Sequence, residues 1–307
     1  MNWLTKDWTI GQLNAVVKNL GEENARAVAA GELTVEVVDT KLLLSPKQHT
    51  VSLFNNLGRR IPPRGLKAKT MKPDRDFLLE QPTFDYGDRL ARINTYFKSA
   101  ANLSEVEFKT RSEKIITSIR EDETVSGVLR GVHLPFVIPQ MDVSDYGQAL
   151  QTLFFPAIER SYRAEFPGRA LPRYGDEVLK SKLDIIEGSR HERLVDAMKH
   201  GAVVGVYFPN CLQGFSVDAA REQMASLPGQ FLLAGGFDVA VSVVAYPEVL
   251  ARDSLVPALD LAALRCGWAN LSFFFDSYEN GYYFVHEGRS RLGESDESCS
   301  GGLVVLG

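Results

Sequence analysis

The chain has 307 residues, of which 45% are hydrophobic and 24% are charged, and its net charge is −5. This is the composition of a globular protein, and it excludes a disordered or fibrous chain. The length is enough for a sizeable core in one large domain or two. Nucleic-acid binding usually needs a basic face, so the acidic balance predicts that nucleic acid is not a partner.

The first forty residues predict a helix, a turn, a second helix and a strand. Thr9 and Gln12 have the spacing of a capping box, and an apolar stripe at helical spacing follows them as far as Gly21. Residues 22–31 predict the second helix, and residues 32–38 alternate like a half-buried strand. This order is also that of a winged helix-turn-helix, but Arg26 is the only basic residue of the second helix. We therefore interpret residues 1–54 as a small module for packing or for contact with a protein partner.

Residues 55–82 contain seven basic residues, four prolines and two glycines, without a period. Such a run of chain breakers predicts a linker between domains. The basic residues could contact an acidic partner or a nucleic-acid backbone, but such a run is more often a solvated loop. The larger domain would then span residues 83–307, with its main core from about residue 120.

Within residues 83–307, strands and helices alternate. Residues 104–122 fit either a strand and a helix or one helix. The later segments predict a strand at 125–139, a helix at 142–168 that Pro156 interrupts, a helix at 189–201, a strand at 202–208, a helix from Ser216 and a strand at 230–234. Residues 237–251 are too apolar to assign by period. Asn280-Gly281 predicts a hairpin, and one more strand closes the chain.

This order predicts an α/β or α+β fold, a mixed sheet with packed helices beside the small N-terminal helical module. We expect parallel strands at the centre of the sheet and antiparallel strands at one end.

The stretch "YFPNCLQGFS" (207–216) suggests a pocket. In open α/β sheets, ligands bind beyond the carboxyl ends of parallel strands, and the strands at 202–208 and 230–234 would deliver two turns to one such edge. A helix starting at Ser216 would point free amides there, which suits a small anionic ligand. The alternative is structural, with Pro209 ending a strand and Gly214 turning the chain. The candidate binding residues are Asn210, Cys211, Gln213, Ser216, Gly235, Gly236 and Asp238.

The sequence supports a catalytic site less well than it supports this pocket. Cys211 could act as a nucleophile near a helix N-terminus, but no histidine is designated as its base, and small buried cysteines are common. The sequence has no Walker loop, zincin signature or nucleophile elbow, and we predict no cofactor and no metal. We therefore expect a binding or interaction protein. The alternative is an enzyme that acts on a small polar or phosphorylated substrate at the 209–216 and 235–238 turns.

The three cysteines, Cys211, Cys266 and Cys299, are few, odd in number and far apart. This pattern favours reduced thiols over disulfides. The start of the chain lacks the apolar region of a signal peptide, and the most apolar stretch is about half a membrane span. We therefore expect a cytoplasmic protein that does not bind membranes.

Residues 8–35, "WTIGQLNAVVKNLGEENARAVAAGELTV", resemble an opening segment of many bacterial proteins of unassigned function. Gly11-Gln12, Asn14-Ala15, Leu20-Gly21 and Gly31-Glu32-Leu33 carry the resemblance. It implies a bacterial, cytosolic setting, and it implies no activity and no catalytic residue.

Overall fold

The computed structural model describes the chain except for residues 1–16, 19, 39–40, 47–51, 78, 98–100, 170–177, 267–270, 280 and 288–291. Contacts divide the chain into two compact units, Met1–Val51 and Ser52–Gly307. The capping box predicted at Thr9 and Gln12 lies outside the described residues.

The smaller unit contains a short helix and a two-stranded sheet. Helix α2 (Glu22–Ala29) begins after Gly21, whose φ of 77° is one that glycine adopts without strain. Strand β1 (Leu33–Val38) pairs with β2 (Lys41–Pro46) in an antiparallel register. The helix and the strand predicted between residues 22 and 38 are confirmed.

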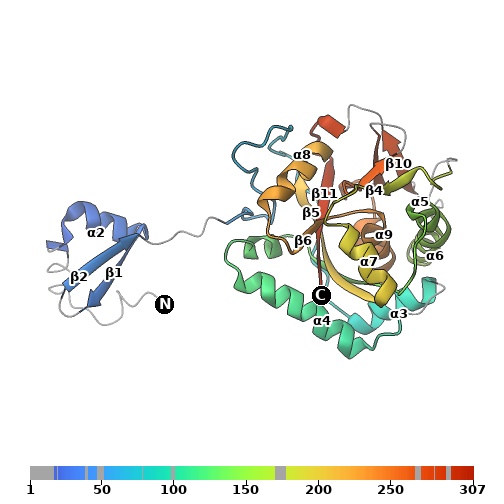
Figure 1. Ribbon diagram of the computed structural model, residues 1–307, viewed down its shortest axis with the longest axis horizontal. Helices are drawn as coiled ribbons and strands as arrows, with labels where there is room; N and C mark the ends of the chain where they lie inside the picture. Colours follow the sequence, from blue (N-terminus) through green and yellow to red (C-terminus); the bar gives the residue numbers. More distant parts are fainter. Residues whose placement is uncertain are drawn as a thin grey trace. The chain divides into compact units, whose positions relative to one another are not determined.

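The larger unit is built on a seven-stranded sheet with the order β10-β9-β7-β11-β5-β3, in which β6 also pairs with β11. Most neighbours are antiparallel, and β7 and β11 are parallel. Helices pack on this mixed sheet, which confirms the predicted fold class (Figure 1). The strands are β3 (Leu134–Ile138), β5 (Val203–Gln213), β6 (Phe231–Leu233), β7 (Ala258–Asp260), β9 (Ser272–Tyr278), β10 (Gly281–Glu287) and β11 (Cys299–Leu306).

The last strand of the chain occupies a central position. β11 lies between β5 and β6 and is antiparallel to both, so β5 and β6 run parallel with β11 between them. The expectation that the strands at 202–208 and 230–234 are adjacent is therefore wrong, and the parallel neighbours among the described strands are β7 and β11. Gly302 makes this insertion feasible, since a Cβ at that position would lie 2.2 Å from the Tyr207 ring.

Strand β5 is longer than predicted and contains the residues expected to form a loop. Pairing with β3 ends at Tyr207, but pairing with β11 continues to Gln213. The register shifts where Phe208 faces Leu303 and Leu212 faces Gly301, so Pro209 lies in a bulge. Proline has no amide proton to donate to a neighbouring strand, and it is tolerated in a bulge because a bulged residue is left unpaired.

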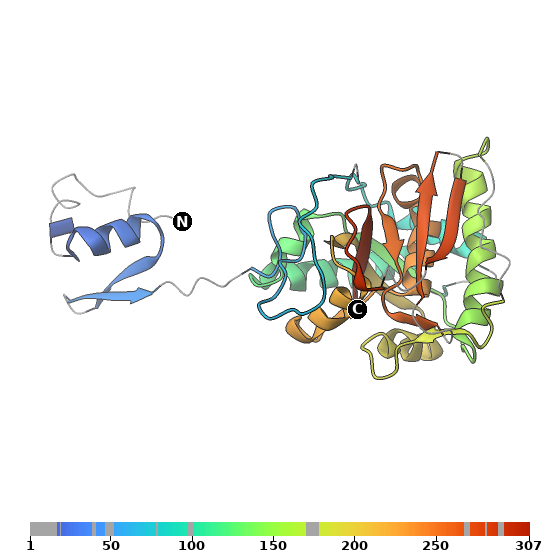
Figure 2. The same cartoon turned by 90° about the horizontal axis from the view of Figure 1, so that it is seen from above.

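The helix expected at 142–168 is a rod of three segments. α5 (Tyr146–Ala149) continues into the π-helical turn η3 (Leu150–Phe154) and then into α6 (Phe155–Glu165). Pro156 lies at the start of α6, where its missing amide proton costs little, so the predicted interruption is confirmed. Figure 2 shows the rod alongside β9 and β10, where Phe155 packs edge-on against Phe275.

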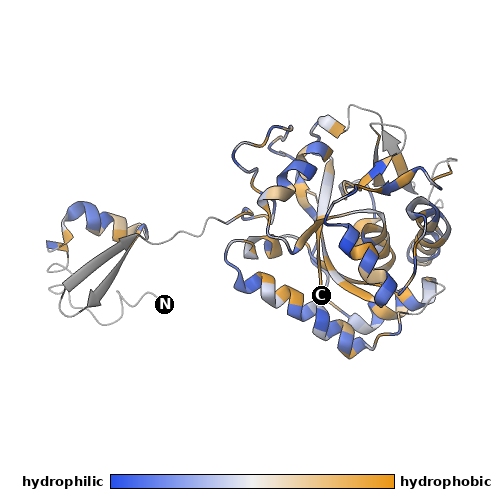
Figure 3. Cartoon of the chain, viewed as in Figure 1, coloured by the Kyte–Doolittle hydropathy of each residue, from blue (hydrophilic) through white to orange (hydrophobic). Residues whose placement is uncertain are grey.

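Two helices form in segments whose secondary structure could not be assigned from the sequence. α9 (Gly236–Ala245) is buried along all ten residues, which explains its lack of an apolar period. α4 (Glu105–Glu121) is one helix capped by Ser104, and hydrophobic residues interrupt its hydrophilic surface (Figure 3). The other helical segments are α3 (Tyr86–Tyr96), η2 (Ser126–Arg130), α7 (Glu192–His200), α8 (Val217–Glu222), η4 (Gln223–Ser226) and α10 (Pro247–Leu250); β4 (Leu183–Ile185) pairs with β8 (Leu264–Cys266).

The hairpin predicted near the end of the chain is confirmed. β9 and β10 pair in an antiparallel register that begins with Tyr278 opposite Gly281. Asn280, the other residue of the predicted turn, lies outside the described residues.

Residues 52–82, here called the strap, belong to the larger unit and include the segment expected to be a linker. The amide of Arg60 donates to the carbonyl of Cys211 at 2.7 Å, and that of Met71 donates to Gly214 at 2.8 Å. The amides of Lys67 and Ala68 donate to the carboxylate of Glu222 in α8. The strap thus covers the edge of β5 beyond β3, which a free linker would not do (Figure 1).

Candidate functional site

Three of the predicted binding residues, Asn210, Cys211 and Gln213, lie within β5 rather than in a loop. The Cys211 side chain is 2% exposed, and its thiol donates to the carbonyl of Phe208 at 3.2 Å. Burial raises the pKa of this thiol, so it remains protonated at neutral pH. A buried, protonated thiol is a poor nucleophile, and the geometry gives Cys211 no catalytic role.

Gln213 fastens two segments of backbone together. Its buried side-chain amide donates to the carbonyl of Arg75 at 2.9 Å and to that of Glu297 at 2.8 Å. Arg75 belongs to the strap and Glu297 precedes β11. The Nε2 group is therefore committed to protein carbonyls, and we assign Gln213 a structural role.

Ser216 caps helix α8, as its place in the sequence predicted. Its hydroxyl accepts a hydrogen bond from the amide of Ala219 at 3.1 Å. The Ser216 side chain is itself buried. Its contribution is the satisfaction of one free amide at the helix start.

Gly235, Gly236 and Asp238 meet at the N-terminus of α9, but buried side chains occupy the space expected for a ligand. The Tyr146 hydroxyl accepts from the amides of Gly236 at 2.8 Å and of Phe237 at 3.1 Å. Both carboxylate oxygens of Asp238 accept from the amide of Gly235 at 3.0 Å. The glycines are needed because a Cβ on Gly235 would lie 2.6 Å from the His191 ring.

His191 completes this buried cluster. Its Nδ1 lies 3.0 Å from the carbonyl of Leu233 and must donate to it, because a carbonyl can only accept. Its Nε2 then faces the Tyr146 hydroxyl at 3.5 Å and an Asp238 oxygen at 3.8 Å. The sequence placed His191 on a helix, but only tertiary structure brings it to Tyr146 and Asp238.

Burial sets the electrostatics of the cluster. It raises the pKa of Asp238, against the opposing effects of His191 and the Gly235 amide. It also raises the pKa of Tyr146 well above its ordinary value, with a further contribution from the charge of Asp238. These groups hold the start of α9 and the end of β6 together, and their polar atoms point at one another.

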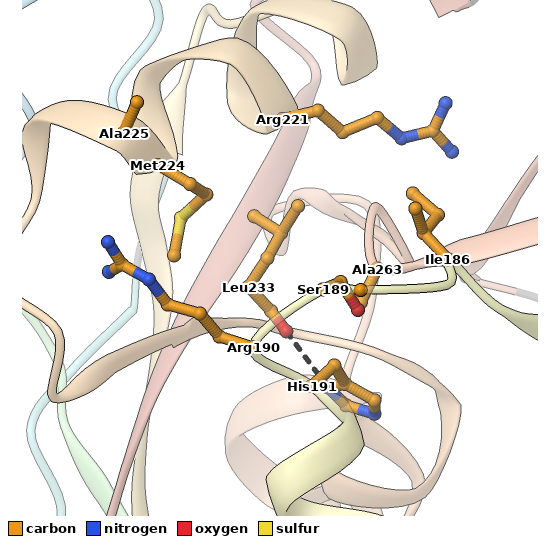
Figure 4. A pocket seen from close by; sticks show the side chains of 10 residues that line it. Ile186, Ser189, Arg190, His191, Arg221, Met224, Ala225, Leu233 and Ala263 are labelled. Carbon is orange, nitrogen blue, oxygen red and sulfur yellow. Dashed lines mark hydrogen bonds between the residues drawn. The ribbon is translucent and has the colours of Figure 1, made fainter.

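A cavity of about 270 Å³ lies beside this cluster, at the carboxyl end of β6 (Figure 4). It contains none of the seven predicted binding residues. Its wall is mostly apolar, with Met224, Leu233 and Ala263 among its members. The lining residues are Ile186, Gly188, Ser189, Arg190, His191, Arg221, Met224, Ala225, Leu233 and Ala263.

The two arginines of the cavity are fixed by the backbone. The Arg190 guanidinium donates to the carbonyls of Leu227, Pro228 and Phe231. The Arg221 guanidinium donates to Ala262 at 2.9 Å and to Leu264 at 2.7 Å. These bonds make the wall rigid, as a preformed binding site requires.

Ser189 supplies the cavity with a polar group that has no partner. Its hydroxyl oxygen is buried and makes no hydrogen bond within the described part of the chain. A buried hydroxyl without a partner costs free energy that a ligand could recover. No sequence pattern distinguishes this residue, because a lone serine before a helix is ordinary.

Asn210, the remaining predicted residue, lines a different cavity, beside η2. The structure therefore does not bring the two predicted turns to one shared pocket, although both lie toward the same end of the sheet. The reason is the position of β11, which separates β5 from β6.

Comparison with known proteins gives no match, since no protein-family model, curated protein or solved structure is significantly similar to this chain. Among the described residues, no group of three or more His, Cys, Asp or Glu side chains could hold a metal ion. Within the same residues, no helix combines the length and apolar character needed to cross a membrane.

Proposed function

We propose that the protein is a binding protein and that its larger unit holds a small, mostly apolar molecule in the cavity beside α7 and α8. The observation that carries this proposal is a cavity with a fixed apolar wall and an unpartnered hydroxyl on Ser189. Binding sites combine these features, an apolar lining and a few placed polar groups.

The size and chemistry of the cavity define the ligand. About 270 Å³ suits a molecule of roughly one or two rings, near the lower limit for small-molecule sites. Met224, Leu233 and the side-chain stem of Arg221 would contact its apolar body. One polar end would bond the Ser189 hydroxyl.

The setting that we propose is the bacterial cytoplasm, which is supported by the resemblance of residues 8–35 and by three cysteines that form no disulfide. In the smaller unit, α2 buries none of its residues, which supports a role in contact with a protein partner. The enzymatic alternative has less support, because Cys211 is buried and the two turns form no common cavity.

A fragment screen on the full chain, read by amide chemical shifts, tests the binding site. We expect small aromatic fragments to shift the amides of Ser189, His191 and Ala263. Ala225 is exposed and lines the cavity, so A225W should block entry to the cavity without disturbing the packing of the hydrophobic core. Ala164, exposed on α6, provides the matched control A164W, which should bind fragments normally. If A225W binds as well as A164W, the cavity is not the site.

A further inference from the structure

A second cavity, of about 380 Å³, lies where β3 stops covering β5. The strap and the end of η2 form its walls, and Asn210 reaches it from the bulge of β5. Bulges often redirect a side chain in this way. The lining residues are Asn56, Leu57, Arg59, Asp76, Phe77, Leu79, Gln81, Leu129, Arg130, Gly131, Val132 and Asn210.

Arg59 is the most unusual residue of this cavity because it is a charged residue that is only 9% exposed. Its Nη2 donates to Asp76 at 2.7 Å, and its Nε is buried with no hydrogen-bond partner among the described residues. The Asp76 side chain, in contrast, is 75% exposed. A buried guanidinium with one solvent-exposed partner and an unpaired donor is incompletely satisfied.

Two further polar groups of the wall are available. Arg130 is exposed and makes no ion pair within the part of the chain that the structure describes. The side-chain amide of Asn210 likewise makes no hydrogen bond to a described residue. Gln81 is different, since its amide already bonds both the N–H and the carbonyl of His133.

The position of Arg59 is fixed before any ligand arrives. The Asn55 side chain accepts from the amides of Leu57 and Arg59, which closes a tight turn. Gly58, at φ 76°, packs this turn against Gly131, where a Cβ would lie 2.3 Å from the Gly131 nitrogen. Such preorganisation lowers the entropic cost of binding.

The net charge of the cavity wall determines which ligand charge fits best. Its ionisable side chains are Arg59, Arg130 and Asp76, which together carry a charge of +1. A monoanion would neutralise this charge, whereas a doubly charged phosphate would leave an excess. Leu129 and Val132 also line the cavity, and their apolar side chains would contact the hydrocarbon part of a ligand.

We propose that this cavity is a second binding site, for a small organic carboxylate whose anionic group bonds Arg59, Arg130 and Asn210. The proposal is independent of the cavity beside α7, because the two share no lining residue. It gives the basic strap and Asn210 a common role.

Titration of the full chain with benzoate, followed by amide chemical shifts and calorimetry, tests the proposal. Benzoate should give saturable shifts at Arg59, Gly131 and Asn210, and inorganic phosphate should bind more weakly. R130Q and N210A should each weaken benzoate binding, R130Q by about tenfold or more because a charge-assisted contact is lost. Arg130 and Asn210 are not core residues, so these variants should fold.

The matched control is R163Q, which removes an exposed charge from α6 and should leave benzoate binding unchanged. Equal weakening by R130Q and R163Q would mean that binding follows only net charge, and would overturn the proposal. Tighter binding of phosphate than of benzoate, or no saturable shift at millimolar benzoate, would also overturn it.

Discussion

Asp238 is an ionisable residue in a fully buried position at the start of α9. Its carboxylate accepts from the amide of Gly235, and this bond favours the charged form. Desolvation has the opposite effect and is larger, so the pKa of Asp238 is raised. A raised folded-state pKa means that the folded protein binds a proton more tightly than the unfolded chain does.

The pH dependence of stability follows from this sign. The contribution of Asp238 is fully present below about pH 4, the ordinary carboxyl value, and it is lost as pH rises through the higher folded-state pKa. D238N keeps an oxygen for the Gly235 amide and does not ionise. We predict that its free energy of unfolding, relative to the unmodified protein, rises as the pH increases above about 4.

Urea unfolding of both proteins between acidic and neutral pH measures this difference. D238A is the comparison, because it leaves the Gly235 amide unsatisfied at every pH and should be destabilised by about 1–3 kcal/mol. If the unmodified protein instead gains stability over D238N as the pH rises through 4, the carboxylate is stabilised by its neighbours and our sign is wrong.

At the scale of elements, Gln213 of β5 joins the strap to the segment before β11, because its side-chain amide donates to the carbonyl of Arg75 and to that of Glu297. We predict that Q213A is destabilised by about 1–3 kcal/mol, because two part-buried hydrogen bonds to backbone carbonyls are lost. Amide exchange near Arg75 should accelerate more than exchange in α9, since the lost bonds hold the strap and not the central helix.

Gln148 is the control for this change, since it is exposed on α5 and its side chain makes no hydrogen bond to another residue that the structure describes. Q148A should alter the free energy of unfolding by no more than about 0.5 kcal/mol. Equal stability of the two variants would show that water replaces the Gln213 bonds and that the amide does not anchor the strap.

Elements with local signals could be predicted from the sequence. Ser216 starts α8 because a hydroxyl can satisfy a free amide within one turn, and Pro156 interrupts a helix because it has no amide proton. The length of β5 could not be predicted, because Pro209 ends a strand unless a bulge accommodates it. That bulge depends on β11, more than ninety residues later in the sequence.

The candidate site shows the same limit. The sequence grouped Gly235, Gly236 and Asp238 correctly at one helix start, because all three lie within four consecutive positions. It could not show that Tyr146 would fill the space before their amides, since that contact spans ninety residues. It also could not find the cavity beside α7, whose walls come from four separate segments of the chain.

For the whole molecule, the division into units can be tested by where the chain is cut. The hydrophobic core of the larger unit draws its buried residues from Phe54 to Val305, and no described residue of Met1–Val51 belongs to it. We therefore predict that a chain beginning at Ser52 folds alone. Its amide spectrum should superimpose on that of the intact protein, and its melting temperature should differ by less than about 4 °C.

A chain beginning at residue 83 should behave differently, because it lacks the strap. Phe54 packs against Phe231 with ring centroids 6.0 Å apart, and the Arg60 guanidinium bonds Gln223 and Ser226 in η4. Removing the strap would expose the edge of β5 and leave these partners unsatisfied. We predict that this shorter chain aggregates or melts well below the chain that begins at Ser52. Equal melting temperatures of the two would show that the strap is a linker after all, since its contacts would then contribute no stability to the larger unit.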